Sequence, residues 1–153
     1  MSSTIERTLI IMKPDALQRS LLGEIVRRFE LKGLKIVGLK MIKLSDAHLD
    51  RHYAHHKDKP FFDDLKKFMM SSPVVMLVLE GADSVNAVRI IVGQTRGNVA
   101  DAGSIRGDFS MGNKNLVHAS DSAASAAEEI SHFFKSDELF DYEKIDYDFI
   151  YGD

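Results

Sequence analysis

The sequence predicts an α/β or α+β sandwich, in which helices pack on a β-sheet. The prediction rests first on short apolar runs, typical of buried strands, that alternate with segments whose apolar residues recur at helical spacing. The second observation is the composition: the 153 residues are 44% hydrophobic and 28% charged, as in an ordinary globular protein. We therefore expect a single domain over residues 1–153, with one core.

The first half of the chain begins with an apolar run over residues 8–12, which Lys13-Pro14-Asp15 ends. This pattern predicts a buried strand that ends in a turn. Apolar residues at helical spacing predict a helix over about 20–32, which Gly33 ends. The alternation over residues 34–43 predicts a half-exposed strand.

The middle of the chain contains helix signals on either side of the clearest strand. Ser45 is a good N-cap for a helix through about residue 56, and Pro60 opens another helix. Residues 73–80 form the predicted central strand, with proline at its entry, where no ladder donor is needed. Asp83 is expected to begin a helix that runs through Val92.

The last part of the chain begins with residues 93–114, which are rich in glycine and polar residues and predict a long functional loop. Residues 116–118 predict a short strand. Ser120-Asp121-Ser122 then supplies cap residues for an alanine-rich helix over 123–134. The tail after Ser136 is acidic, and we expect it to be a solvated surface.

Charge and cysteine content exclude several classes of protein. Residues 1–70 carry a net charge of +5 and the remainder −8, with basic residues dispersed among acidic ones, so dedicated nucleic-acid binding is not expected. No cysteine is present, which excludes disulfides, thiolate metal sites and a cysteine nucleophile. The apolar run at residues 9–12 is too short for a signal peptide or a membrane span. We expect a cytoplasmic protein that does not contact a membrane.

Phosphate binding would have to use side chains, because neither GxxxxGK[ST] nor GxGxxG occurs in the sequence. Candidate side chains gather in the loop after Gly93: Gln94-Thr95-Arg96-Gly97, Gly103 to Asp108 with Arg106, and Lys114-Asn115. Arg89 on the preceding helix is a further candidate. Guanidinium groups bind phosphate oxygens in bidentate fashion, and glycine permits close backbone approach. The alternative for each arginine is a surface residue that aids solubility.

His118 is the candidate nucleophile, because it ends a predicted strand just before a helix N-terminus, where backbone amides and the helix dipole attract phosphate. Glu129, eleven residues later, lies in the helix that packs back and could orient the imidazole. Spacing alone favours an ordinary core or surface histidine over a nucleophile.

Four further histidines, His48, His52, His55 and His56, have spacings that place three of them on one helical face. Adventitious zinc or nickel binding there is one interpretation. The segment is rich in Lys and Asp, and we expect a solvated face. Nearby aromatic residues could cover a base or sugar, or pack in the core: Tyr53, Phe61 and Phe62.

Taken together, several motifs resemble the nucleoside diphosphate kinase family from about Glu6 to Tyr151. They are Lys13-Pro14-Asp15, Arg106-Gly107-Asp108-Phe109 and, most specifically, Asn115-Leu116-Val117-His118-Ala119-Ser120-Asp121-Ser122. Shorter matches agree in register: Gly23-Glu24-Ile25, Pro60-Phe61-Phe62 and Pro73-Val74-Val75. The resemblance implies an α+β sandwich with a ferredoxin-like antiparallel sheet (βαββαβ) and additional helices.

The resemblance also implies a ping-pong reaction, in which a nucleoside triphosphate such as ATP phosphorylates the enzyme and a nucleoside diphosphate such as GDP removes the phosphoryl group. By position, His118 matches the phosphorylated histidine, supported by Ser120 and Glu129. Lys13 and Tyr53 match residues near the transferred phosphate, and Phe61 matches the aromatic residue that stacks on the base. The positions that match phosphate-binding residues are Arg89, Thr95 and Arg106. Asn115 matches the residue that contacts the ribose. Mg²⁺ would be carried by the nucleotide phosphates, with no metal site in the protein.

The family assembles as hexamers or tetramers, and the nearly full-length C-terminal segment favours a hexamer. This sequence departs from the family at three places. Ala119 stands where the family usually has a glycine, Arg96-Gly97 stands where it has an asparagine-proline pair, and Ala102 stands where it has a proline. One residue is also missing between Arg106 and Asn115. We expect activity to survive at Ala119 and the loop to be less rigid. The alternative functions are a nucleotide-binding regulatory or scaffold protein without catalysis and, more weakly, a nucleic-acid binder that uses the basic half.

Overall fold

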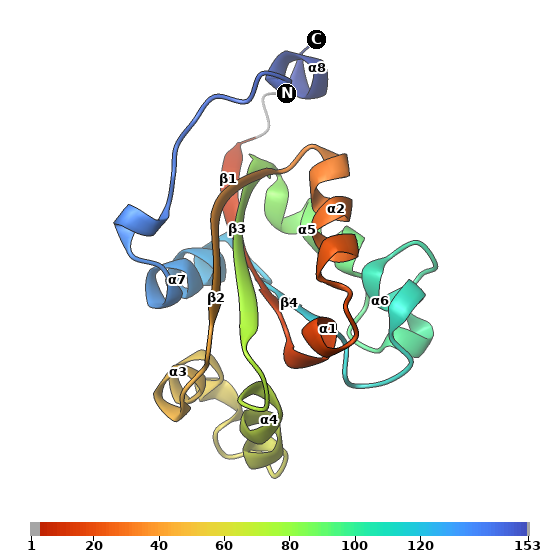
Figure 1. The fold of residues 1–153 in the computed structure, drawn as a ribbon, viewed down its shortest axis with the longest axis vertical. Coiled ribbons are helices and arrows are strands. Elements are labelled where there is room, and N and C mark those ends of the chain that lie inside the picture. The colour runs from red at the N-terminus through yellow and green to blue at the C-terminus, as the bar shows by residue number, and fades with distance from the viewer. Residues whose placement is uncertain (1–3, 153) are drawn as a thin grey trace.

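Four antiparallel strands form one sheet with the order β2-β3-β1-β4 in the computed structural model, which describes residues 4–152 (Figure 1). The strands are β1 (Ile5–Met12), β2 (Lys35–Ile42), β3 (Val74–Ala82) and β4 (Val117–Ala119). β3 lies between β1 and β2, so the two strands that flank the first long helix are not neighbours. The predicted antiparallel α+β arrangement is confirmed, and β1 begins earlier than expected.

Three predicted helices are confirmed as α2 (Leu22–Lys32), α5 (Ser84–Val92) and α7 (Ala123–Phe133). Gly33, with φ of 97°, ends α2, and the Ser122 hydroxyl accepts the backbone N–H of Ser125 at the start of α7. Short helices that the sequence analysis did not predict are α1 (Pro14–Gln18), α6 (Ile105–Phe109) and α8 (Tyr147–Tyr151). No helix within residues 4–152 is long and apolar enough to cross a membrane.

The helix predicted from Ser45 to about residue 56 is wrong beyond His52. Ser45 does cap α3 (Asp46–His52), but Tyr53 turns its side chain into the core and adopts non-helical backbone angles. A separate 3-10 turn follows at Ala54–His56, and α4 (Phe62–Met69) begins only after Pro60. The loop over 93–114 likewise contains structure of its own, namely a 3-10 turn (Gly97–Val99) and α6.

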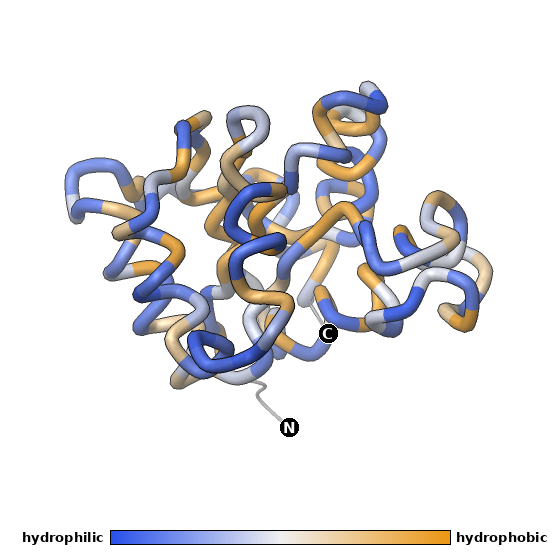
Figure 2. The backbone as a smooth tube through the Cα atoms, turned by 90° about the horizontal axis from the view of Figure 1, so that it is seen from below, coloured by the Kyte–Doolittle hydropathy of each residue, from blue (hydrophilic) through white to orange (hydrophobic). Residues whose placement is uncertain are grey.

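The sheet separates two clusters of buried apolar side chains. Ile10 and Met12 of β1 pack with α2 and α5 on one face, and Leu9 and Ile11 pack with α3, α4 and α7 on the other. Figure 2 shows the apolar segments concentrated in the middle of the molecule, with hydrophilic loops around them. Burial on both faces explains why β1 is a continuous apolar run rather than an alternating one.

The sheet also determines where His118 points. Its neighbours in β4, Val117 and Ala119, belong to the core beneath α2 and α5. Because successive strand residues point to opposite faces, His118 points toward α3 and α7. β4 pairs with the end of β1, so His118 lies beside Ile11 and close to Lys13.

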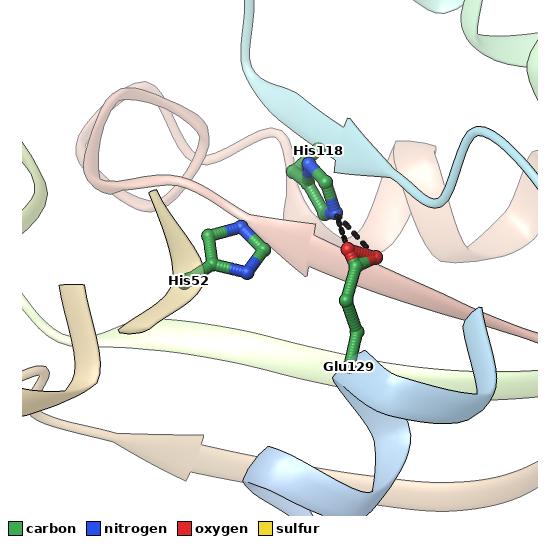
Figure 3. Close-up of side chains that lie close together, drawn as sticks. All are labelled: His52, His118 and Glu129. Carbon is green, nitrogen blue, oxygen red and sulfur yellow. Dashed lines mark hydrogen bonds and ion pairs between the residues drawn. The ribbon is translucent and has the colours of Figure 1, made fainter. Parts of the chain in front are cut away.

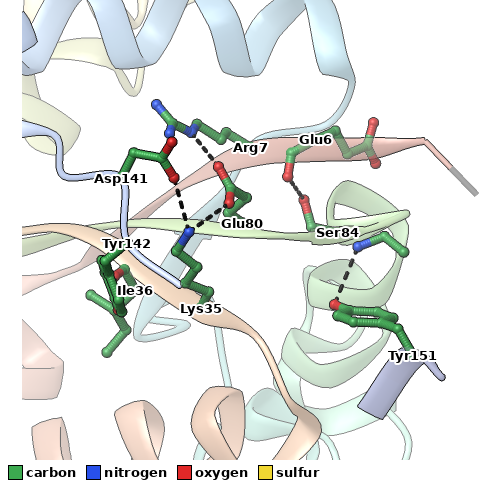
Figure 4. A network of polar contacts seen from close by, with 10 residues as sticks. Glu6, Arg7, Lys35, Ile36, Glu80, Ser84, Asp141, Tyr142 and Tyr151 are labelled. Carbon is green, nitrogen blue, oxygen red and sulfur yellow. Dashed lines mark hydrogen bonds and ion pairs between the residues drawn. The ribbon is translucent and has the colours of Figure 1, made fainter. Parts of the chain in front are cut away.

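The acidic tail is docked along β2, so the expectation of a merely solvated surface is incomplete. The Phe140 N–H donates to the Val37 carbonyl at 2.8 Å, and the Lys35 ammonium lies 3.2 Å from both Glu80 and Asp141 (Figure 4). The Tyr151 hydroxyl accepts the Ala82 N–H at 3.3 Å, which places α8 beside the end of β3. There α8 lines an open pocket of about 600 Å³. Many tail side chains nevertheless remain exposed.

Candidate active site

His118 is held by a carboxylate, which a buried hydroxyl in turn holds in place. Its Nε2 lies 3.0 Å from both carboxylate oxygens of Glu129 on α7 (Figure 3). The Ser120 hydroxyl donates to Glu129 Oε1 at 2.8 Å, and Ser120 is completely buried. The Leu9 N–H donates to Ser120 Oγ at 3.1 Å, which ties this hydroxyl to β1. The structure thus brings His118 against Glu129, and Ser120 reaches His118 only through Glu129.

The charge on Glu129 determines which imidazole nitrogen is free. Burial acts to raise the pKa of Glu129, but the hydrogen bonds from His118 and Ser120 and the attraction of the imidazole outweigh it and lower the pKa below its usual value. An ionised carboxylate only accepts hydrogen bonds, so Nε2 of His118 carries the proton and donates. Nδ1 then keeps its lone pair and can act as a nucleophile.

A second group of polar residues joins the ends of β1 and β4. Lys13 Nζ donates to Asn115 Oδ1 at 2.8 Å, and Asn115 Nδ2 donates to the Thr95 carbonyl at 2.9 Å. Arg106 donates to the Asn115 carbonyl at 3.2 Å and to the Gly93 carbonyl at 3.1 Å. Four of the predicted nucleotide-binding residues, distant in sequence, are thus joined through Asn115.

These cations repel one another. Burial and the neighbouring Arg106 lower the pKa of Lys13 to about 8, although Asp15 opposes the change. Burial and the charge of Arg89 lower the pKa of Arg106 to about 10. Like charges held together inside a protein attract an anion, because its binding relieves their repulsion and restores lost solvation. The arrangement suits a polyphosphate.

The interpretation of the four histidines as a solvated face is wrong for His52. Its ring centroid lies 4.6 Å from that of His118, at an interplanar angle of 83°, and 5.4 Å from that of Phe133. Burial, with the charge of His118, lowers the pKa of His52 to about 3, so the side chain is neutral. A sequence signal existed: His52 follows Leu49 by three residues and therefore shares the buried face of α3. His55, by contrast, is exposed.

The aromatic candidates divide between core and surface. Tyr53 is 8% exposed, and burial raises its pKa to about 12 with a contribution from Glu129. Phe62 is 6% exposed and packs in the core, whereas Phe61 is 47% exposed. The Phe61 ring lies 5.2 Å from His56, whose ring stacks 6.1 Å from Tyr53. A series of rings therefore leads from His118 through His52 and Tyr53 to an exposed phenylalanine.

The departures at Ala119 and Gly97 both fit the backbone. Non-glycine residues with positive φ within residues 4–152 are Ser20, Asp83 and Leu116, so Ala119 occupies a conformation open to any residue. At Gly97 an added Cβ would lie 2.1 Å from the Ser110 carbonyl oxygen, so this loop packs more closely than a side chain permits.

The chain is similar to known proteins over most of its length. The family model described as nucleoside diphosphate kinase matches residues 6–139. The chain is 51% identical over 140 residues to a nucleoside diphosphate kinase of Parabacteroides distasonis, covering 91% of this chain and 92% of the relative.

Two solved structures are similar along nearly their whole length. A halophilic nucleoside diphosphate kinase from Halobacterium salinarum in complex with CDP superposes with a TM-score of 0.94 at 43% identity, covering 97% of this chain and 99% of that one. A transition-state mimic of the Borrelia burgdorferi enzyme with bound vanadate and ADP has a TM-score of 0.90 at 35% identity, covering 97% and 98%. With a family model that matches most of the chain and relatives this similar, the chain belongs to the nucleoside diphosphate kinase family.

Proposed function

We propose that this enzyme transfers the terminal phosphoryl group of a nucleoside triphosphate to a nucleoside diphosphate through a phosphohistidine at His118. The Nδ1 lone pair attacks the γ-phosphorus, the bond from that phosphorus to the β–γ bridging oxygen breaks, and the nucleoside diphosphate leaves. A terminal β-phosphate oxygen of the second nucleoside diphosphate then attacks the same phosphorus and breaks the P–N bond. The observation that carries the proposal is the hydrogen bond between His118 Nε2 and Glu129, because it leaves Nδ1 free.

The other site residues are proposed to position the nucleotide and to balance its charge. The transition state for phosphoryl transfer is loose and spreads negative charge over the equatorial oxygens, so Lys13, Arg106 and Arg89 would stabilise it electrostatically. Thr95 would also contact the phosphates, with Tyr53 near the transferred group. We assign Asn115 to the ribose and exposed Phe61 to the base, where stacking would make base selection loose. The CDP and ADP in the two similar structures support nucleotide binding by this chain.

Mg²⁺ is proposed to enter as part of the substrate, bound to the nucleotide phosphates, where it neutralises charge on the transferring group. Oxygen ligands suit Mg²⁺, and the phosphates supply them. No step of the proposed reaction requires a metal ion held by the protein alone.

Intact mass spectrometry tests the mechanism. After incubation with Mg-ATP and no acceptor, the wild type should gain one acid-labile phosphoryl group, and a GDP chase should remove it and form GTP. His118→Ala should gain none while keeping its far-UV circular dichroism spectrum. A wild type that binds ATP without phosphorylation would overturn the proposal and favour the regulatory alternative. So would a phosphorylated, active His118→Ala variant.

A hexamer built from residues 1–153 as one domain is proposed for the assembly, in the cytoplasm. Exposed apolar side chains on several elements of the isolated chain support association: Leu39 and Met41 on β2, Leu31 on α2, Ile90 on α5, and Phe149 on α8. Light scattering at working concentration should give six times the chain mass. A monomer or a tetramer would contradict the proposed hexamer but would leave the proposed reaction unaffected. Cell fractionation tests the proposed location in the cytoplasm.

A further inference from the structure

Three side chains from three elements point into one space beside the sheet. His52 comes from α3, His118 from β4 and Glu129 from α7 (Figure 3). One ring nitrogen of each histidine and one carboxylate oxygen all lie within 4.8 Å of one another. Because packing of α3 and α7 on the same face of the sheet creates this arrangement, it needs no further folding step to form.

Two imidazoles and one carboxylate make a ligand set for a borderline transition metal rather than for Mg²⁺. Zn²⁺ takes His₂Glu sets with bonds of about 2.0–2.2 Å, which puts tetrahedral ligand atoms about 3.4 Å apart. The 3.0 Å between His118 Nε2 and Glu129 is already close to that spacing. A small movement of His52 would complete three ligands and leave a fourth position open. Mg²⁺ prefers octahedral oxygen ligands and is disfavoured here.

His52 has an unused ligand atom. Its Nε2 is buried and has no hydrogen-bond partner among the described residues. A buried polar atom without a partner costs free energy, which a metal–nitrogen bond would recover. We propose that His52, His118 and Glu129 form an inhibitory binding site for Zn²⁺.

The inhibitory consequence rests on the function proposed above, whereas the binding of Zn²⁺ does not. A neutral imidazole holds one proton and one free lone pair. If Zn²⁺ takes the Nε2 lone pair of His118, the proton moves from Nε2 to Nδ1. The nitrogen proposed to attack phosphorus then has no free lone pair, and Glu129 is engaged by the metal. Zn²⁺ would thus block phosphorylation without occupying the nucleotide site around Asn115.

Calorimetric titration with ZnCl₂ alone, without nucleotide, tests the site itself. The wild type should bind one Zn²⁺ per chain at these ligands. His52→Gln and Glu129→Gln should each weaken binding by at least about tenfold, the lower end of the loss seen for residues that merely orient metal ligands. His55→Gln is the matched control, because this nearby histidine is exposed, and its affinity should stay within about twofold of wild type. Circular dichroism checks that each variant is folded.

Phosphoenzyme formation from Mg-ATP at buffered free Zn²⁺ tests the consequence. Zn²⁺ should slow wild-type phosphorylation, and His52→Gln should require at least about tenfold more Zn²⁺ for the same inhibition. The proposed zinc site would be refuted if the wild type did not bind Zn²⁺, or if His55→Gln and His52→Gln lowered the affinity for Zn²⁺ equally. Zinc that binds as predicted but leaves phosphorylation unchanged would overturn the inhibition. An enzyme that forms no phosphoenzyme even without Zn²⁺ would instead contradict the proposed function, and the calorimetric result would still decide the site.

Discussion

The guanidinium of Arg28 on α2 lies 2.7 Å from the carboxylate of Asp108 on α6. Arg28 also donates to the Gly103 carbonyl at 2.9 Å and lies 4.9 Å from the centre of the Phe109 ring. Asp108 in turn accepts the Gly103 N–H at 2.8 Å. These contacts anchor α6, which carries Arg106. They also restrain the loop over residues 93–114, which lacks the prolines common in the family.

Arg28→Met should therefore disturb nucleotide binding from a distance. We expect kcat/KM to fall by about tenfold, because small misplacement of a positioning group is costly. The melting temperature should fall by only a few degrees, as for loss of about 1 kcal/mol. Arg27→Met is the control, since Arg27 is exposed on the same helix. A variant that melts earlier but keeps its kcat/KM would show that the ion pair serves stability alone.

Glu129→Gln should reduce the rate of phosphorylation far more than nucleotide binding. The amide keeps the shape but removes the charge that holds the proton on His118 Nε2, and a comparable change in a catalytic triad costs about 10⁴-fold in kcat. We expect a loss of about 10²–10⁴-fold in kcat with KM nearly unchanged. Rapid-quench measurement of phosphoenzyme formation checks it. A rate within about twofold of wild type would refute the orienting role.

Ser120→Ala should cost less, about tenfold in kcat, because Ser120 acts through Glu129. In the double variant Ser120→Ala/Glu129→Gln the two losses should not multiply, since both residues belong to one hydrogen-bonded unit. A double-mutant cycle on the phosphorylation rate measures this coupling. Strict additivity of the two free-energy changes would show that the residues act independently.

The lowered pKa of Lys13 predicts an alkaline limit to activity. The pH profile of kcat/KM reports the free enzyme, so it should fall above pH about 8 as the Lys13 ammonium loses its proton. In Lys13→Arg the guanidinium stays charged, so the fall of kcat/KM above pH about 8 should disappear, even if the rate at neutral pH is lower. If kcat/KM of Lys13→Arg falls above pH about 8 as in the wild type, another group is responsible for the titration.

The same residue should affect stability in the opposite direction. The unfolded chain keeps the Lys13 proton up to a pKa of 10.5, whereas the native state releases it at about 8. The unfolded state thus binds more protons between these values, and the contribution of Lys13 to stability rises with pH across that window. Urea unfolding of wild type and Lys13→Met at pH 8 and 10 tests this: the free energy of unfolding of the wild type should rise relative to that of Lys13→Met from pH 8 to pH 10.

Two glycines should respond oppositely to alanine. A Cβ at Gly97 would lie 2.1 Å from the Ser110 carbonyl oxygen, so Gly97→Ala should force the backbone apart and destabilise the protein by about 1–3 kcal/mol. Gly23 lies in α2 with nothing within 4 Å of an added Cβ, and Gly23→Ala should stabilise by about 0.5–1 kcal/mol. Chemical denaturation of both variants provides the test. Equal effects would refute the packing argument.

Local patterns were sufficient for most of the secondary structure. A continuous apolar run identified β1, and the helical spacing of apolar residues identified α2. Cap residues such as Gly33 and Ser122 identified helix ends, because all of these signals act within a few residues. The prediction of secondary structure failed where tertiary packing overrides these local signals. Tyr53 ends α3 early because its ring is buried, and the tail docks through contacts to β2 that no local pattern reveals.

The sequence by itself determined the order of the main strands and helices and the motifs that resemble the family, and it identified Glu129 in the next helix as a candidate partner of His118. These are properties of residue type and spacing. Tertiary structure alone decided that His52 packs against His118, that Lys13 contacts Asn115 where β1 and β4 meet, and that the Nε2 of His118 faces the carboxylate. The reason is physical: desolvation and charge coupling depend on which distant residues a side chain is buried among, and that is established only when the sheet and its helices pack together.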